Sequence, residues 1–138
     1  MIELNLNIIS DYAAVPEISR SIRGFLLDQN VEDHICNAAE ICLIEALNNV
    51  IKHAYLGDHT KTIDITVRKD NESLELRMID EGKPRESLVV NELDFDPGDI
   101  QNLPEGGMGL FIIKQLMDEM NYYTINGKNY FTLKKWFC

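Results

Sequence analysis

Residues 32–55 read EDHICNAAEICLIEALNNVIKHAY, and residues 62–79 read TIDITVRKDNESLELRMI. The first stretch repeats apolar residues three and four positions apart, which predicts a helix over about residues 32–54 with one wide apolar face. The second stretch alternates apolar and polar residues on both sides of Asp70-Asn71, which predicts a β-hairpin. A helix with an apolar face followed by an antiparallel hairpin indicates a sheet with helices packed against it.

On the N-terminal side of these stretches, residues 2–9 alternate as a half-buried strand does. The helix-capping residues Ser10 and Asp11 then precede an apolar repeat at helical spacing that continues to about residue 28. One further strand and one further helix are therefore predicted ahead of the long helix.

On the C-terminal side, apolar spacing predicts a third helix over about residues 108–120. Two more strands are predicted at residues 122–125 and 130–136, around a turn at residues 126–129. That turn contains Asn126-Gly127, a dipeptide that favours tight hairpin turns. The chain therefore ends in a second predicted hairpin.

The chain has 138 residues, enough for one two-layer core, and its 45% hydrophobic and 26% charged residues are ordinary for a soluble globular protein. We therefore predict one α+β domain over residues 1–138, a two-layer α/β sandwich in which a mostly antiparallel sheet packs on three helices. The net charge of −10 argues against binding to a nucleic-acid backbone or to a membrane surface, since both need clustered cations.

The N-terminus carries an acid, Glu3, where a secretory signal requires basic residues, and no apolar run approaches the roughly 20 residues of a membrane span. The three cysteines, Cys36, Cys42 and Cys138, are odd in number and lack metal-ligand spacing. Cys36 and Cys42 fall in one predicted helix and are interpreted as core thiols. These features predict a cytoplasmic protein.

Three polar residues, Glu45, Asn49 and His53, follow one another at four-residue intervals along the apolar second helix. This spacing places them in one strip, and buried polar groups need partners. The strip indicates either a cleft or a solvent-exposed helix edge. In a cleft, Asn49 offers an oxygen suited to Mg²⁺, and Glu45 can accept a proton from a water or hydroxyl that attacks a phosphate.

Two further motifs carry glycine. Asp80-Glu81-Gly82 ends a predicted strand, where a carboxylate can accept a hydrogen bond from an exocyclic amine such as that of adenine; the alternative is an ordinary turn. Residues 106–109, GGMG, open the third helix, where backbone N–H groups can bind phosphate; the alternative is a flexible hinge. Together with the polar strip, the order and spacing of these motifs predict one site for ATP and Mg²⁺.

Between the two glycine motifs, residues 80–107 are rich in glycine, proline and acids and carry few periodic apolar residues. A structureless connection of this length is uncommon in a compact domain and often serves as a functional lid. The composition is also compatible with a disordered insertion.

The sequence resembles the GHKL ATPase superfamily, whose domains have the Bergerat ATP-binding fold, and within it the bacterial anti-sigma-factor serine/threonine kinases. Residues 45–55, EALNNVIKHAY, are similar to the N box of that superfamily. Asp80-Glu81-Gly82 is similar to its adenine box, and residues 107–119, GMGLFIIKQLMDE, are similar to its glycine box and the helix that follows. The resemblance covers nearly the whole chain.

The resemblance implies that Glu45 is the general base, that Asn49 is the Mg²⁺ ligand, and that Asp80 binds the adenine amine. It also implies an ATP lid over about residues 82–106. It further implies that Gly82 lies beside the adenine and that Gly107 and Gly109 line the phosphate site. We also predict nucleotide contacts at His53, Met108 and Leu110; taken singly, His53 also fits a structural hydrogen-bonding residue. In one respect the sequence departs from some members of the family, because Glu105 stands before the glycine box where they carry a basic residue.

Proteins of this family phosphorylate a serine or threonine of a STAS-domain anti-sigma-factor antagonist, bind a sigma factor, and form homodimers. The resemblance therefore predicts a protein kinase with those partners. A second hypothesis is an ATP-dependent binding or switch module with little or no kinase activity. A third is a histidine-kinase catalytic domain separated from its sensor; the chain begins directly at the first predicted strand, without dimerising helices.

Overall fold

The computed structural model describes residues 1–85 and 108–137. The helical elements are the short 3₁₀ turn η1 (Tyr12–Ala14), α1 (Val15–Asp28), α2 (Asp33–Asn49), the π-helical turn η2 (Val50–Ala54) and α3 (Met108–Leu116). The strands are β1 (Ile2–Ile9), β2 (Thr62–Lys69), β3 (Ser73–Asp80), β4 (Glu119–Ile125) and β5 (Lys128–Trp136). No helix in these two ranges combines the length and the apolar composition that a membrane crossing requires.

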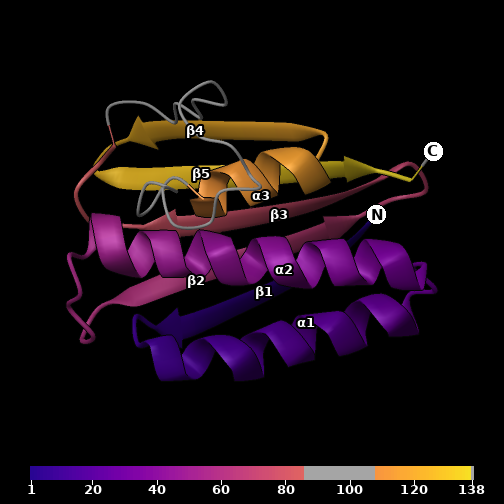
Figure 1. Ribbon diagram of the computed structural model, residues 1–138, viewed down its shortest axis with the longest axis horizontal. Helices are drawn as coiled ribbons and strands as arrows, with labels where there is room; N and C mark the ends of the chain where they lie inside the picture. Colours follow the sequence, from indigo (N-terminus) through magenta and orange to yellow (C-terminus); the bar gives the residue numbers. More distant parts are fainter. Residues whose placement is uncertain (86–107, 138) are drawn as a thin grey trace.

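The five strands form one antiparallel sheet in the order β1-β2-β3-β5-β4. The helices cover one face of this sheet, with α2 between α1 and α3 (Figure 1). The apolar faces of helices and sheet meet in one core, which includes Ile22, Leu43, Leu76 and Leu133. The predicted α+β class and two-layer sandwich are thus confirmed.

The two described cysteines belong to the core. Cys36 and Cys42 are buried free thiols on α2, as the sequence predicted. Burial raises the pKa of the Cys42 thiol to about 12, and the nearby charge of Glu45 acts in the same direction. The thiol is therefore neutral at physiological pH and contributes to packing.

The third helix is shorter than predicted. The sequence suggested residues 108–120, but α3 ends at Leu116 and β4 begins at Glu119. The backbone N–H of Asp118 donates to the carbonyl of Lys134 at 2.9 Å, and the Asp118 carboxylate accepts from the backbone N–H of Trp136 at 2.7 Å. These bonds to β5 end the helix and start the edge strand.

The final turn is also tighter than predicted. Asn126 and Gly127 both have positive φ, 51° and 78°, so two residues suffice to reverse the chain. Lys128 and Asn129, which the sequence assigned to the turn, therefore belong to β5 and pair with Ile125 and Thr124.

The end of the long second helix differs from a regular α-helix. The sequence predicted one helix over residues 32–54, but its last five residues form the wider turn η2, in which the Tyr55 N–H bonds to the Val50 carbonyl at 3.0 Å. The Ala54 carbonyl instead accepts from the N–H of Lys83 at 2.8 Å. This bond joins the helix end to the loop that follows β3.

Candidate functional site

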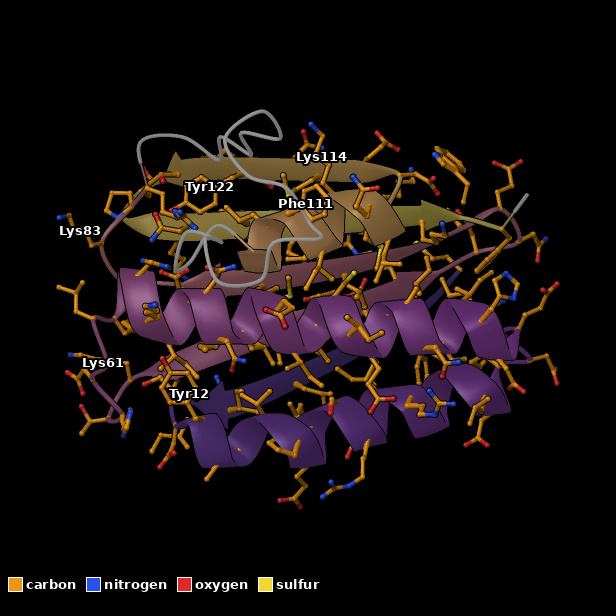
Figure 2. All side chains as sticks on the ribbon, viewed as in Figure 1. Tyr12, Lys61, Lys83, Phe111, Lys114 and Tyr122 are labelled. Atoms are coloured by element: carbon orange, nitrogen blue, oxygen red, sulfur yellow. The ribbon has the colours of Figure 1, made fainter. Side chains whose placement is uncertain are left out.

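An open cavity of about 300 Å³ lies where the C-terminal half of α2 meets the first turn of α3. Glu45, Asn49 and His53 all line it, so the polar strip on the helix faces one cleft. The other described lining residues are Tyr12, Asn48, Lys52, Gly109 and Ile112. Figure 2 shows Tyr12 at the same end of the molecule as Lys61 and Lys83, where α1 begins.

Gly109 lies unusually close to the polar strip. A Cβ atom built on Gly109 would lie 2.8 Å from Glu45 Oε2 and 3.4 Å from Asn49 Nδ2. Any larger residue here would push against the carboxylate. The structure thus brings the glycine-led helix and the Asn49 carboxamide together, although the sequence separates them by about 60 positions.

A second, much smaller cavity of about 20 Å³ lies on the other side of Asn49, between η2 and the sheet. Its described lining residues are Asn49, Val50, Ala54, Asp80, Arg85, Tyr122 and Phe131. Asn49 therefore borders both cavities. The larger one contains Glu45 and Gly109, and the smaller, more apolar one contains Asp80.

Asp80 is a buried carboxylate at the end of β3, with 3% of its surface exposed. Its Oδ1 accepts from the Gly82 N–H at 2.9 Å and from Asn129 Nδ2 at 2.8 Å. Burial raises the pKa of Asp80, while the hydrogen bonds from Asn129 and Gly82 oppose that rise. A buried carboxylate at the wall of a cavity can accept a further hydrogen bond.

Gly82 is required by the packing of the turn after β3. A Cβ atom on Gly82 would collide with the Ala54 carbonyl oxygen, and it would lie 2.6 Å from the carbonyl carbon and 2.9 Å from Tyr55 Cδ1. The Tyr55 hydroxyl accepts from the Glu81 N–H at 3.0 Å and donates to the Thr62 carbonyl at 2.6 Å. The turn is thereby held against the end of the helix.

Asn129 is a site residue that the sequence analysis missed. It is 1% exposed, and its Nδ2 donates to both Asp80 Oδ1 and the Gly82 carbonyl, at 2.8 and 3.0 Å. Its Oδ1 accepts from the Thr124 hydroxyl at 2.8 Å. An available signal was its position in the strand, because residue 129 shares the inward alternation of Phe131 and Leu133.

His53 lines the larger cavity, next to Lys52. Its Nε2 is buried and has no hydrogen-bond partner among residues 1–85 and 108–137. Burial lowers the pKa of His53, and the charges of Arg85 and Lys52 lower it further. The imidazole is therefore neutral at pH 7.

The remaining predicted site residues are placed less directly. Leu110 is 2% exposed and belongs to the core beneath the cavity. Met108 begins α3. Gly107, Glu105 and most of the predicted lid over residues 82–106 lie outside the described residues. The roles assigned to all these residues, and to Glu45 and Asn49, stay predictions.

Comparison with known proteins identifies relatives over most of the chain. Residues 8–135 match the family described as the histidine kinase-like ATPase domain. The serine/threonine-protein kinase BtrW of Bordetella bronchiseptica is 31% identical over 99 residues, which cover 67% of this chain and 65% of that protein. The chain spans less than two thirds of the length of the first curated relatives that it matches.

Two solved structures have the same fold. The RsbU and RsbW domains of Rv1364c from Mycobacterium tuberculosis superpose with a TM-score of 0.69 at 14% identity, covering 98% of this chain and 32% of that one. The SiaB–SiaC complex from Pseudomonas aeruginosa gives 0.62 at 17% identity, covering 96% and 89%. With a family match over almost its whole length and a five-stranded sheet covered by helices on one face, the chain belongs to the histidine kinase-like ATPase domain family.

Proposed function

We propose that this chain is an ATP-dependent protein kinase that phosphorylates a serine or threonine of a small STAS-domain anti-sigma-factor antagonist. The observation that carries the proposal is the position of Glu45. Its carboxylate lies one helical turn from Asn49 and next to Gly109, on the wall of an open cavity. A carboxylate there is accessible to a hydroxyl that enters from outside.

The chemistry of the lining residues fits a magnesium nucleotide. Asn49 lines both cavities and carries a carboxamide oxygen, which can serve as one ligand of Mg²⁺ when phosphates and water complete the coordination. In the proposal, Asp80 accepts the adenine amine, with Gly82 beside it. The phosphate contacts are assigned to His53, to Gly107, to Met108 and Gly109 at the N-terminal end of α3, and to the backbone of Leu110. Bound Mg²⁺ would neutralise phosphate charge during transfer.

In the proposed reaction, one side chain of this protein takes up a proton. Glu45 accepts the proton of the substrate's serine or threonine hydroxyl, and the oxygen of that hydroxyl forms a bond to the γ-phosphorus. At the same time the bond between the γ-phosphorus and the β,γ-bridging oxygen breaks, and ADP leaves with the electron pair. Asn49 and the backbone of α3 hold the groups in line. Positioning of this kind is the main source of catalysis in phosphoryl transfer.

The proposed partners follow from the resemblance to anti-sigma-factor kinases. They are the STAS-domain substrate, a sigma factor, and a second copy of the chain in a homodimer, in the cytoplasm. Two comparisons support this choice: BtrW is named a serine/threonine-protein kinase, and SiaB was solved in complex with a second protein, SiaC. The proposal also treats residues 1–138 as one domain with an ATP lid at about residues 82–106.

The test is incubation of the chain with labelled ATP, Mg²⁺ and the STAS-domain protein whose gene lies nearest, followed by analysis for phosphoserine and phosphothreonine. We expect labelled antagonist with the unmodified chain and none with Glu45→Ala, while both bind ATP equally in calorimetry. Glu17→Ala, which removes an exposed carboxylate from α1, serves as the matched control and should transfer normally.

Three outcomes decide between the hypotheses. Equal transfer by Glu45→Ala would remove Glu45 from the mechanism. ATP binding without transfer to any STAS-domain protein would favour the ATP-dependent switch module. Absence of ATP binding by the unmodified chain would reject both.

A further inference from the structure

Arg85 places a guanidinium group against the smaller cavity, on the segment that follows the Asp80–Gly82 turn. Its Nη1 is buried and has no hydrogen-bond partner within residues 1–85 and 108–137. Its backbone N–H donates to the Tyr122 hydroxyl of β4 at 2.9 Å, so the start of the side chain is fixed at the cavity wall. A buried guanidinium N–H without an acceptor carries a free-energy cost that an incoming anion would remove.

The size of the cavity shows which part of its wall must move. About 20 Å³ holds roughly one water molecule, so no purine ring can enter without displacing a side chain. The other described lining residues belong to α2, η2 or the strands β3, β4 and β5, so the hydrogen bonds of those elements hold their backbones in place. Arg85 lies outside any helix or strand, and its long side chain has several rotatable bonds. It is the part of this wall that can turn aside at least cost.

The charge of Arg85 also acts on the larger cavity. It contributes to the lowered pKa of His53, a residue that lines that cavity and not the smaller one. Asn49 borders both cavities. The guanidinium thus lies near the boundary between the two cavities: the smaller one, proposed for the adenine ring, and the larger one, proposed for the phosphates.

We propose that Arg85 binds the phosphate chain of the nucleotide: as the base enters beside Asp80, the guanidinium leaves the small cavity and pairs with phosphate oxygens next to Asn49. This inference rests on the proposed nucleotide site and adds a residue to it. Guanidinium is suited to the task because its planar N–H groups match two oxygens of one phosphate. It would supply a cation in a chain whose glycine box is preceded by Glu105 and whose net charge is −10.

The test compares ATP, ADP and adenosine by calorimetry at one fixed salt concentration with Mg²⁺. Arg85→Met removes the charge and keeps a long side chain. We expect it to weaken ATP and ADP binding roughly ten- to hundredfold and to change adenosine binding by less than about twofold. Arg85→Lys keeps the charge but loses the planar set of N–H groups. Its affinity for ATP and ADP should therefore fall less than that of Arg85→Met, and its affinity for adenosine should not change.

Lys61→Met is the matched control, because it removes the same charge from an exposed position that lines neither cavity and lies outside the proposed lid. It should bind all three ligands like the unmodified chain. Melting temperatures verify that each variant is folded, and Arg85→Lys keeps the test decisive if Arg85→Met does not fold.

Two results would overturn the inference. An equal loss for all three ligands would show that Arg85 acts on the base or on the fold, and unchanged ATP affinity would show that it does not contact the nucleotide. Failure of the underlying site gives a different result, since the unmodified chain would then bind none of the ligands.

Discussion

Asn129 Nδ2 lies 2.8 Å from Asp80 Oδ1, and this hydrogen bond joins two residues that are 49 positions apart in the sequence. Both side chains are almost fully buried, so neither can exchange its partner for solvent. The carboxylate is thereby fixed in one orientation at the cavity wall, and its charge is partly compensated. Asn129 is thus a positioning residue: it acts on the site through Asp80.

Asn129→Ala should therefore alter the titration of Asp80 as well as the stability of the fold. Loss of the strongest opposing hydrogen bond should raise the pKa of Asp80 further, weaken ATP binding, and lower the free energy of unfolding by about 1–3 kcal/mol. Carboxyl NMR titration, calorimetry and urea unfolding measure the three effects. Asn121→Ala, at an exposed position of β4, is the control. An unchanged Asp80 titration would mean that Asn129 has only a structural role.

Asp80→Asn should weaken ATP binding at least about tenfold without destabilising the fold at neutral pH. Because burial raises the pKa of Asp80, the folded state holds its proton more tightly than the unfolded state. Ionisation therefore removes stability as the pH rises from 3.8, the ordinary Asp value, through the raised value. A carboxamide keeps an oxygen for Asn129 and Gly82 and avoids that loss.

The relative stability of Asp80→Asn should thus increase with pH above 3.8 and then level off, as measured by urea unfolding at several pH values. Asp64→Asn, on the exposed face of β2, should leave the ATP affinity unchanged. If Asp80→Asn bound ATP as the unmodified chain does, the adenine assignment would be wrong.

Gly109→Ala should separate helix stability from function. The new methyl group favours the helix by up to about 1 kcal/mol, but it would lie 2.8 Å from Glu45 Oε2 and displace that carboxylate. We expect a folded protein whose phosphoryl transfer falls at least tenfold, which the labelled-ATP assay measures. Gly24→Ala in α1 has no atom within 4 Å of the new Cβ, so it should stabilise the fold and leave transfer intact. If Gly109→Ala transferred phosphate at the normal rate, the close approach of residue 109 to the Glu45 carboxylate would not be required for phosphoryl transfer.

His53 should respond to bound nucleotide through its pKa. In the free chain, burial and the positive charges of Arg85 and Lys52 hold this pKa below 6.5, the ordinary value. Triphosphate in the adjoining cavity would stabilise the protonated imidazole and raise the pKa, so ATP affinity should increase as the pH falls through the raised value. NMR titration of His53 with and without ATP measures the shift. Identical titration of His53 would place the phosphates elsewhere.

The fold was predictable because its signals are local. Alternation in residues 62–79 and apolar spacing in residues 32–54 depend on neighbours in sequence, and both correspond to the elements of the structure. The end of α3 was not predictable in this way, because the apolar residues Met117 and Met120 continue a helical spacing. The bonds from Asp118 to β5 decide that boundary, and they join residues that are distant in sequence.

The same distinction applies to the site. Glu45, Asn49 and His53 were identifiable because four-residue spacing on a helix gives a common face. The contact of Asn129 with Asp80 and the position of Arg85 beside Asn49 were not predictable, since they depend on strand pairing and on the path of a loop. The Asn126-Gly127 dipeptide also led to the prediction of a four-residue turn over residues 126–129, so Asn129 was not assigned to a strand.

The wide turn at Val50–Ala54 restricts how this chain can change during evolution. Deleting one residue there would restore ordinary helical bonding, but it would rotate everything downstream by about 100° and shift it by about 1.5 Å along the axis. The Ala54 carbonyl would lose Lys83, and the Tyr55 hydroxyl would lose Glu81. Divergent descendants of this chain can therefore substitute side chains in the segment more readily than they can alter its length.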